Sequence, residues 1–306
     1  MANAERADLP RSVSSSAMAS ILEGLGISLI VSTYQTGNIV LISAENENIN
    51  THFVPFARPM GIALHGNLLA IGGARGVTWF QSQPDFELDA SETIYDACFL
   101  PRRLDVTGRI AIHEIAFAGD ELWIANTAFS ALCTLDGLHS FVPRWRPRFI
   151  SSLAAEDRCH LNGIAIDDER VRTVTTLSDT NGPAGWRQCK PNSGLAIDVP
   201  TGEVMIRGLS MPHSPRWYDG ALWLLESGKG SLSRGDIAGG RADIIAELPG
   251  FTRGLAFAGP FAFIGLSQAR ERVFGGIELL SRVPQCCCGI WVIDIRSGET
   301  VAFIQF

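Results

Sequence analysis

Five short stretches of this 306-residue chain repeat one pattern of small and apolar residues, and this repeat limits the fold more than any other feature. The stretches read Arg58-Pro-Met-Gly-Ile-Ala-Leu64, Ile112-His-Glu-Ile-Ala-Phe117, His160-Leu-Asn-Gly-Ile-Ala-Ile166, Pro212-His-Ser-Pro-Arg-Trp217 and Phe251-Thr-Arg-Gly-Leu-Ala-Phe257. They are aligned on Ala63, Ala116, Ala165, Arg216 and Ala256, which lie 40 to 53 residues apart. A period of this length, filled with short strands, is typical of a radial or stacked repeat.

Each repeat opens with two apolar segments that are joined by a turn. Asp219-Gly220, for example, precedes the apolar run Leu222-Trp-Leu-Leu225. Gly, Asn and Asp adopt the positive φ angles that tight hairpins require. A short polar segment and a third strand follow, and no comparable stretch keeps a helical period. The pattern predicts an all-β chain with about four strands in each repeat, which is a propeller blade.

A further unit precedes the first stretch, because residues 27–43 read as a second and a third strand. We therefore predict a six-bladed β-propeller of four-stranded antiparallel blades, with a flexible lead-in over residues 1–16 and a single propeller domain over residues 17–306. The ring has to close without a flat exposed edge, so we expect the N-terminal segment to pair with residues 301–306. Either residues 18–24 provide the innermost strand of the first blade, or a helix fills the place of that strand.

Charge and composition exclude several kinds of partner. The formal net charge is −7 and the basic residues are scattered, so no nucleic-acid partner is expected. The apolar residues 21–31 are interrupted by Glu23 and two glycines and are too short to span a membrane, so no membrane partner is expected either. The seven cysteines are an odd number without small-scaffold spacing, which suits a reducing compartment. A cytoplasmic location is predicted.

One column of the aligned repeats carries the candidate functional residues. Three positions before the aligned residue it holds Met60, His113, Asn162, His213 and Arg253. First strands surround the axis of a propeller, so these side chains are expected to meet there, and His160 is expected to share the face of Asn162 by strand alternation. By the same alternation His113 and Glu114 cannot both face the axis unless their strand is bulged.

Two kinds of chemistry are expected from this column. Neutral imidazole is a common ligand of transition metals, so His113, His160 and His213 are the predicted ligands of a metal ion, with Fe, Cu and Zn as candidates. Arg253 is expected to hold a carboxylate or another anion of a small-molecule ligand in the axial pocket.

Polar segments after the second strands are expected to form a rim around the same end of the axis. The rim comprises Tyr34, Arg75, Asn126, Thr127, Ser130, Glu226, Lys229, Ser267 and Gln268. Trp186 and Arg187 lie in an insertion that is expected to form a lid or a stacking platform. The predicted substrate contacts are Asn162, Arg253, Asn126, Glu226, Trp186 and Arg187.

Two functions of different classes are open at this point. One is a small-molecule-binding propeller that, with a transition metal, acts as an enzyme of undetermined reaction. The other is a non-catalytic propeller that binds a protein or glycan partner through its rim, around a hydrated polar channel whose histidines satisfy backbone carbonyls. Cys159, beside His160, is a nucleophile candidate whose simpler interpretation is packing, and Cys286-Cys-Cys288 is interpreted as a set of buried thiols.

Three runs resemble a bacterial family of β-propeller proteins known as conserved hypothetical proteins. They read Cys159-His-Leu-Asn-Gly-Ile-Ala165, Gly208-Leu-Ser-Met-Pro-His-Ser-Pro-Arg-Trp217 and Leu248-Pro-Gly-Phe-Thr-Arg-Gly-Leu-Ala256. The resemblance implies a propeller and carries no activity. More distantly, the layout is similar to gluconolactonase and senescence-marker propellers, which implies a divalent cation held by carboxylates and amides. Only Asn162 matches those ligands in kind, and imidazole suits softer ions, so a calcium lactonase is disfavoured.

Overall fold

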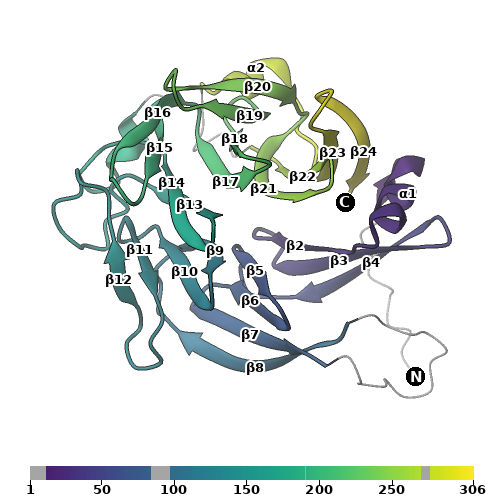
Figure 1. Ribbon diagram of the computed structural model, residues 1–306, viewed down its shortest axis with the longest axis horizontal. Helices are drawn as coiled ribbons and strands as arrows, with labels where there is room; N and C mark the ends of the chain where they lie inside the picture. Colours follow the sequence, from purple (N-terminus) through teal and green to yellow (C-terminus); the bar gives the residue numbers. More distant parts are fainter. Residues whose placement is uncertain (1–11, 84–96, 190, 270–275) are drawn as a thin grey trace, which may run out of the picture.

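Six antiparallel sheets follow one another around a central axis (Figure 1). The computed structural model describes residues 12–83, 97–189, 191–269 and 276–306. We number the sheets as blades in chain order. Blade 1 contains β2 (Leu29–Thr33), β3 (Asn38–Glu45) and β4 (Asn48–Pro55), and blade 2 contains β5 (Ile62–His65), β6 (Leu68–Gly72), β7 (Gly76–Ser82) and β8 (Phe99–Val106). Blade 3 contains β9 (Ile112–Ala118), β10 (Glu121–Asn126), β11 (Ala131–Thr134) and β12 (Val142–Trp145), and blade 4 contains β13 (Leu161–Asp167), β14 (Arg170–Thr176), β15 (Gly194–Asp198) and β16 (Val204–Leu209). Blade 5 contains β17 (Pro212–Tyr218), β18 (Ala221–Glu226), β19 (Ser231–Asp236) and β20 (Arg241–Glu247), and blade 6 contains β21 (Phe251–Ala258), β22 (Phe261–Ser267), β23 (Gly289–Asp294) and β24 (Glu299–Gln305). The predicted six-bladed β-propeller is confirmed.

Each of the five repeated stretches becomes the first strand of a blade, hairpinned to the second strand. The turn before β10 contains Gly119 at φ 57°, and the turn before β18 contains Asp219 at φ 48° and Gly220 at φ 69°. These are the left-handed conformations that Gly and Asp adopt most readily, and they allow the chain to reverse within two residues. The turn residues that the sequence marks are therefore the ones that form these hairpins.

The hydrophobic core lies between blades rather than inside one sheet. One cluster joins blades 5 and 6 through Trp223, Leu232, Leu255 and Ile264. Other clusters join blades 3 and 4, blades 2 and 3, and blades 6 and 1. Face-to-face packing of this kind makes the ring one cooperative unit.

Blade 1 has three strands among the described residues and starts at the position of a second strand. In blades 3 and 5 a hydroxyl just after the second strand donates to a carbonyl of the next blade's first strand: Thr127 Oγ1 to the Leu161 oxygen at 2.5 Å, and Ser227 Oγ to the Thr252 oxygen at 2.6 Å. Ser32, in β2, makes a similar bond to the oxygen of Met60, just before the first strand of blade 2, at 2.6 Å. β2 is thus equivalent to the second strands, as the sequence predicts.

A helix joins the first blade to the last. α1 (Ser16–Leu25) packs against β3, β4 and β24, at the side of the ring and away from the axis (Figure 1). Its Met18 and Leu22 are completely buried in a cluster that includes Val40 and Ile304. A helix forms over residues 18–24, but it does not fill the innermost strand position of blade 1, which has no strand among the described residues.

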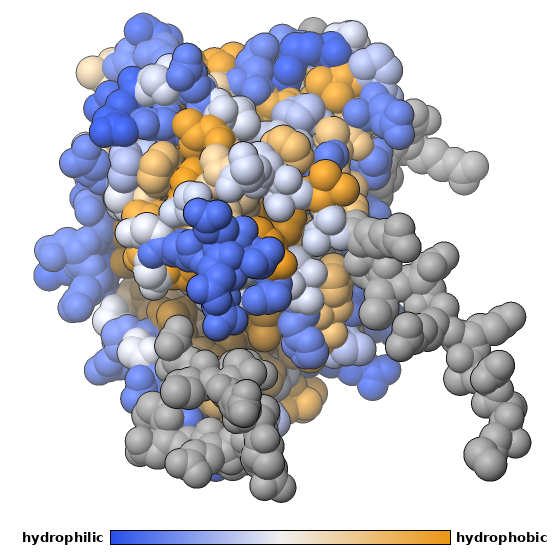
Figure 2. Space-filling model, turned by 90° about the vertical axis from the view of Figure 1, so that its right-hand side faces the viewer, coloured by the Kyte–Doolittle hydropathy of each residue, from blue (hydrophilic) through white to orange (hydrophobic). Residues whose placement is uncertain are grey.

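The N-terminal segment also pairs with the end of the chain, as predicted. β1 (Val13–Ser14) adds a fifth strand to blade 6, with Val13 opposite Gln305 and Ser14 opposite Ile304. Residues 1–11 of the predicted lead-in lie outside the described residues. Figure 2 shows this side of the molecule, where hydrophobic side chains lie between hydrophilic ones.

Two short helices complete the described part of the chain. They are η1 (Gly185–Gln188), a 3-10 turn in blade 4, and α2 (Glu278–Arg282), between β22 and β23. None of the helices in the described ranges is long and apolar enough to cross a membrane.

Candidate functional site

The first strands of blades 3 to 6 each contain a bulge at the predicted column. In β9, Ile115 pairs with Ile124 and Ile112 pairs with Asn126, so His113 and Glu114 together lie opposite one residue. The registers of β13, β17 and β21 shift at the equivalent place. A bulge bends the strand and changes where its side chains point. The sequence analysis required a bulge for His113 and Glu114 to share a face of the strand, and this bulge is present.

A left-handed residue comes just before this column in four blades. Five positions before the aligned residue, Arg58, Ala111, His160 and Met211 have φ angles of 50° to 54°. The expectation that His160 shares a strand face with Asn162 is therefore wrong, because His160 lies before β13 and has a left-handed backbone, so strand alternation does not apply to it. Its ring nevertheless reaches the axis by this turn of the backbone.

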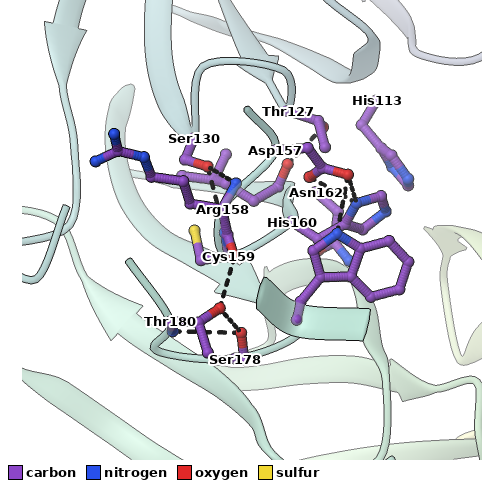
Figure 3. A network of polar contacts seen from close by, with 12 residues as sticks. His113, Thr127, Ser130, Asp157, Arg158, Cys159, His160, Asn162, Ser178 and Thr180 are labelled. Atoms are coloured by element: carbon purple, nitrogen blue, oxygen red, sulfur yellow. Dashed lines mark hydrogen bonds and ion pairs between the residues drawn. The ribbon is translucent and has the colours of Figure 1, made fainter. Parts of the chain in front are cut away.

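Three imidazole rings from three blades lie next to one another at the axis. The ring centroid of His113 is 5.2 Å from that of His160 and 5.4 Å from that of His213. His213 is buried, whereas His113 and His160 are partly exposed. Figure 3 shows His113 and His160 side by side. We call these three residues the histidine trio.

Asp157 and Trp186 fix the ring of His160. Its Nδ1 lies 2.9 and 3.0 Å from the two carboxylate oxygens of Asp157, and Trp186 Nε1 donates to the same carboxylate at 2.9 Å (Figure 3). The Trp186 ring also covers the imidazole, with 4.3 Å between the centroids. The Arg187 guanidinium lies over the Trp186 ring, 4.4 Å from its centroid.

His213 is fixed from the opposite side of the trio. Its Nδ1 lies 3.0 Å from the Met211 carbonyl oxygen and 2.8 Å from Ser227 Oγ. A carbonyl only accepts hydrogen bonds, so this nitrogen carries the ring proton.

Arg253 brings a positive charge to the trio from blade 6. Its Nη2 lies 2.7 Å from His113 Nε2 and 3.1 Å from His113 Nδ1, and it donates to Met60 Sδ at 3.7 Å. A guanidinium only donates, so at least one of the two His113 nitrogens is unprotonated and accepts from Arg253. His113 is therefore a neutral ring beside a fixed cation.

Burial and the guanidinium together keep two of the imidazoles neutral. Desolvation, followed by the charge of Arg253, lowers the pKa of His113 and the pKa of His213 well below the ordinary 6.5. The unfolded chain binds protons below pH 6.5 that the folded chain does not, so this contribution to stability is complete above that pH and is lost as the pH falls.

We expect the free energy of unfolding to fall in mildly acidic solution by about 1.4 kcal/mol per pH unit for each of these two histidines. His213→Asn, whose amide can still donate to Met211, should remove the contribution of one histidine from the slope of the free energy of unfolding against pH. Chemical denaturation across the pH range measures the slope, with His139→Gln as control because His139 lies on the surface, paired with Asp136. Equal slopes for both variants and the parent protein would contradict the lowered pKa of His213.

The family follows from a comparison of the whole sequence. The family described as "Domain of unknown function (DUF4915)" matches residues 16–306. The chain belongs to the DUF4915 family. No curated protein matches the sequence.

One solved structure shows the same fold at low sequence identity, and two others resemble this chain with TM-scores below 0.5. A nidogen/laminin complex matches with 9% identity and a TM-score of 0.55, over 91% of this DUF4915 chain and 98% of that chain. A streptogramin B lyase matches with 10% identity and a TM-score of 0.46, over 91% and 75%. A catalytically inactive virginiamycin B lyase from Staphylococcus aureus, solved with quinupristin, matches with 11% identity and a TM-score of 0.47, over 91% of each chain. These likenesses concern the propeller fold alone.

Three of the predicted substrate contacts lie at hydrogen-bonding positions inside the DUF4915 propeller. Asn162 is 1% exposed, donates to the Pro212 oxygen at 3.0 Å and accepts from Thr175 Oγ1 at 2.7 Å, so its amide joins blade 4 to blade 5. Asn126 is buried and accepts from the Phe129 amide. Glu226 is buried, paired with Lys229 and bonded to the Ser210 amide.

The thiol of Cys159 does not act with His160. Burial raises its pKa to about 12, so it stays protonated in neutral solution and is a poor nucleophile. The packing interpretation of Cys159 is the one that the structure supports.

Sequence reasoning missed two charged residues at the axis. Glu114 pairs with Arg216 of blade 5 at 2.6 Å and accepts from the Ile164 amide of blade 4 at 3.0 Å. The sequence could have indicated Glu114, because it is a charged residue at an aligned position where other repeats have Gly61, Gly163 and Gly254. Asp157 had no comparable signal, because it lies in an irregular loop before the repeat.

The trio is not arranged as a ready set of metal ligands. In the part of the chain that the structure describes, no group of three or more His, Cys, Asp or Glu is placed to hold a metal ion. His160 and His213 have the supported Nδ1 that metal-binding histidines usually show. His113, however, directs an unprotonated nitrogen at Arg253, whose charge opposes a metal cation there.

Proposed function

We propose that this chain is a small-molecule-binding propeller whose axial site takes an anionic ligand at the histidine trio and Arg253. The observation that carries the proposal is the Arg253 guanidinium, which lies 2.7 Å from a neutral imidazole at a partly exposed place on the axis. Guanidinium groups form strong paired hydrogen bonds with carboxylates and phosphates. Whether the bound molecule is also transformed is a further question, and we propose no reaction.

Burial and charge around the site favour an anion over a cation. His113 and His213 stay neutral, and the carboxylate of Asp157 is engaged by His160 and by Trp186. Glu114 is engaged by Arg216. An incoming anion therefore meets a guanidinium and polar rings in a place of reduced solvent, where a charge-assisted hydrogen bond is strong.

We expect Arg253→Ala to weaken the binding of small anions by roughly 30-fold, which corresponds to about 2 kcal/mol for lost charge-assisted hydrogen bonds. Isothermal titration calorimetry with acetate, malonate and inorganic phosphate measures the effect. Arg296→Ala is the matched control, because Arg296 is an exposed arginine paired with Asp294 at the outer surface. Equal affinities in the two variants would place anion binding elsewhere on the protein.

The transition-metal version of the function has its own test. Fe, Cu or Zn would use the Nε2 atoms of His160 and His213, and Arg253 would have to move away from His113. Elemental analysis of protein purified without an affinity tag decides between the two versions. A stoichiometric metal that is lost in both His113→Ala and His213→Ala would replace the anion proposal.

The second candidate function, a protein- or glycan-binding propeller, is favoured by exposed apolar side chains on blades 1 and 2. Leu41 and Val54 of blade 1 and Leu104 and Val106 of blade 2 are exposed. Such a protein would bind neither anions nor metals at the axis, so the same titrations separate the two functions. We keep the cytoplasmic location as a proposal that rests on the number of cysteines.

A further inference from the structure

We infer that β8, the outer strand of blade 2, pairs with the same strand of a second copy of this chain, so that two propellers form a dimer with two-fold symmetry. The two strands run antiparallel, and Leu104 of one copy lies opposite Leu104 of the other. The inference concerns the outer surface of the ring and does not depend on the axial site or on its ligand.

The outer edge of β8 offers backbone groups to a further strand. In the part of the chain that the structure describes, β8 pairs with β7 on one side and with no strand on the other. Figure 1 shows β8 at the outside of the ring. The N–H and C=O groups along such an edge bind another extended chain. Blade 6 shows this addition within the protein, because β1 pairs with the outer edge of β24.

One face of β8 is apolar although it is exposed. Leu104 is 57% exposed and Val106 is 64% exposed, and as alternate residues of one strand they share a face. No other strand among the described residues carries two large aliphatic side chains that are more than half exposed. Contact between these side chains and their counterparts in a second copy would remove apolar surface from water, which favours association.

The opposite face of β8 carries two charges whose order is self-complementary. Arg103 and Asp105 both face Trp79: the guanidinium carbon lies 4.7 Å from the ring centroid, and Asp105 Oδ2 accepts from Trp79 Nε1 at 2.7 Å. Antiparallel pairing about Leu104 places Arg103 of each copy opposite Asp105 of the other. Opposite charges at directly opposed positions stabilise a strand pair, and here they occur twice.

The same charges exclude the neighbouring registers. If the symmetry axis passed through Arg103, two guanidinium groups would lie opposite each other, and if it passed through Asp105, two carboxylates would do so. Like charges at directly opposed positions destabilise a strand pair. Leu104 is therefore the residue of this segment about which both faces of the strand match.

Pro101 and Arg102 limit the pairing to the second half of β8. Trp79 of β7 pairs with Arg103, whereas the next residue, Phe80, pairs with Pro101, so Arg102 is an extra residue in the strand. A proline has no N–H to donate, and a bulge bends its strand. The regular part that remains is residues 103–106, which contains the proposed centre.

Disulfide cross-linking of the full chain tests the register. Directly opposite residues of an antiparallel pair have Cα atoms about 4.5 to 5.5 Å apart, which is within the range of a disulfide. We expect Leu104→Cys to form a covalent dimer on mild oxidation. Arg102→Cys should not, because the two copies of residue 102 would lie about 13 Å apart along the strands. The parent protein, with its seven cysteines, gives the background.

Sedimentation equilibrium measures the association itself. We expect a dimer for the parent protein and about 100-fold weaker association for Leu104→Lys and for Leu104→Glu, because each places two like charges at the symmetry axis. An equimolar mixture of these two variants should form a heterodimer, in which lysine lies opposite glutamate. Ile244→Lys is the matched control: Ile244 is 44% exposed in β20, the outer strand of blade 5, which also contains an Arg-x-Asp sequence at Arg241 and Asp243.

Several results would overturn the inference. One is a parent protein that sediments as a monomer at every concentration. Another is equal cross-linking of Leu104→Cys and Arg102→Cys, which would show that β8 does not pair about residue 104. A mixture of Leu104→Lys and Leu104→Glu that stays monomeric would do the same, as would a dimer that Ile244→Lys weakens as much as Leu104→Lys does.

Discussion

Replacing Glu114 with alanine is expected to lower the free energy of unfolding by about 3 to 5 kcal/mol. The Glu114 side chain is 9% exposed and pairs with Arg216 across the first strand of blade 4. It also satisfies the amide of Ile164 in β13, the first strand of blade 4. Removal of the carboxylate would leave a guanidinium and a buried N–H group without their acceptor, and both losses are costly.

Glu121→Ala is the matched control for this prediction. Glu121 lies in the adjacent strand β10 and pairs with Arg144, but its side chain is 43% exposed. Exposed ion pairs contribute little, so we expect a loss below about 1 kcal/mol. Chemical denaturation followed by tryptophan fluorescence measures both variants. Similar losses in the two would show that Glu114 does not hold blades 3, 4 and 5 together.

The second large effect is expected for Leu22→Ala in α1, at about 2 to 5 kcal/mol. Leu22 is completely buried, and its cluster includes Ile42 of blade 1 and Val292 of blade 6. The substitution leaves a cavity where the ring joins its first and last blades. Hydrogen exchange followed by mass spectrometry should show lost protection in β3 and β24 before blade 4 is affected.

Leu138→Ala controls for the loss of a leucine side chain. Leu138 is 83% exposed in a turn of blade 3, so its truncation should change stability by less than about 0.5 kcal/mol. If Leu22→Ala were equally mild, or if protection were lost evenly around the ring, α1 would not be the element that joins blade 6 to blade 1.

The repeat in the sequence predicts the blades because strand pairing in a propeller is local. Each hairpin is set by its own turn residues, as at Gly119 and Gly220, and needs no information from other blades. Ring closure differs because it depends on residues that are far apart in the sequence. α1 is only ten residues long and gains its stability from Val40, Ile304 and other residues far along the chain, so the sequence leaves a strand and a helix as equal alternatives for residues 18–24.

The candidate site, like the fold, could be predicted from the sequence only in part. The column places His113, His213 and Arg253 together because equivalent positions in different blades face one axis. Strand alternation alone gives the wrong reason for His160, since the left-handed turn before β13 is imposed by contacts with blades 3 and 4. Asn126 and Glu226 are polar residues of the expected kind, but Asn126 accepts from the Phe129 amide and Glu226 accepts from Ser233, contacts within their own blades that no spacing rule reveals.

The left-handed residue that recurs as Arg58, Ala111, His160 and Met211 has an evolutionary consequence. The chain path that displays an imidazole in one blade already exists in three others, where it carries unrelated side chains. A lineage of such proteins could therefore acquire a new binding specificity by single codon changes at these four positions, without insertions and without a change in the backbone. Directed evolution of the binding preference can begin with a small library confined to these four positions.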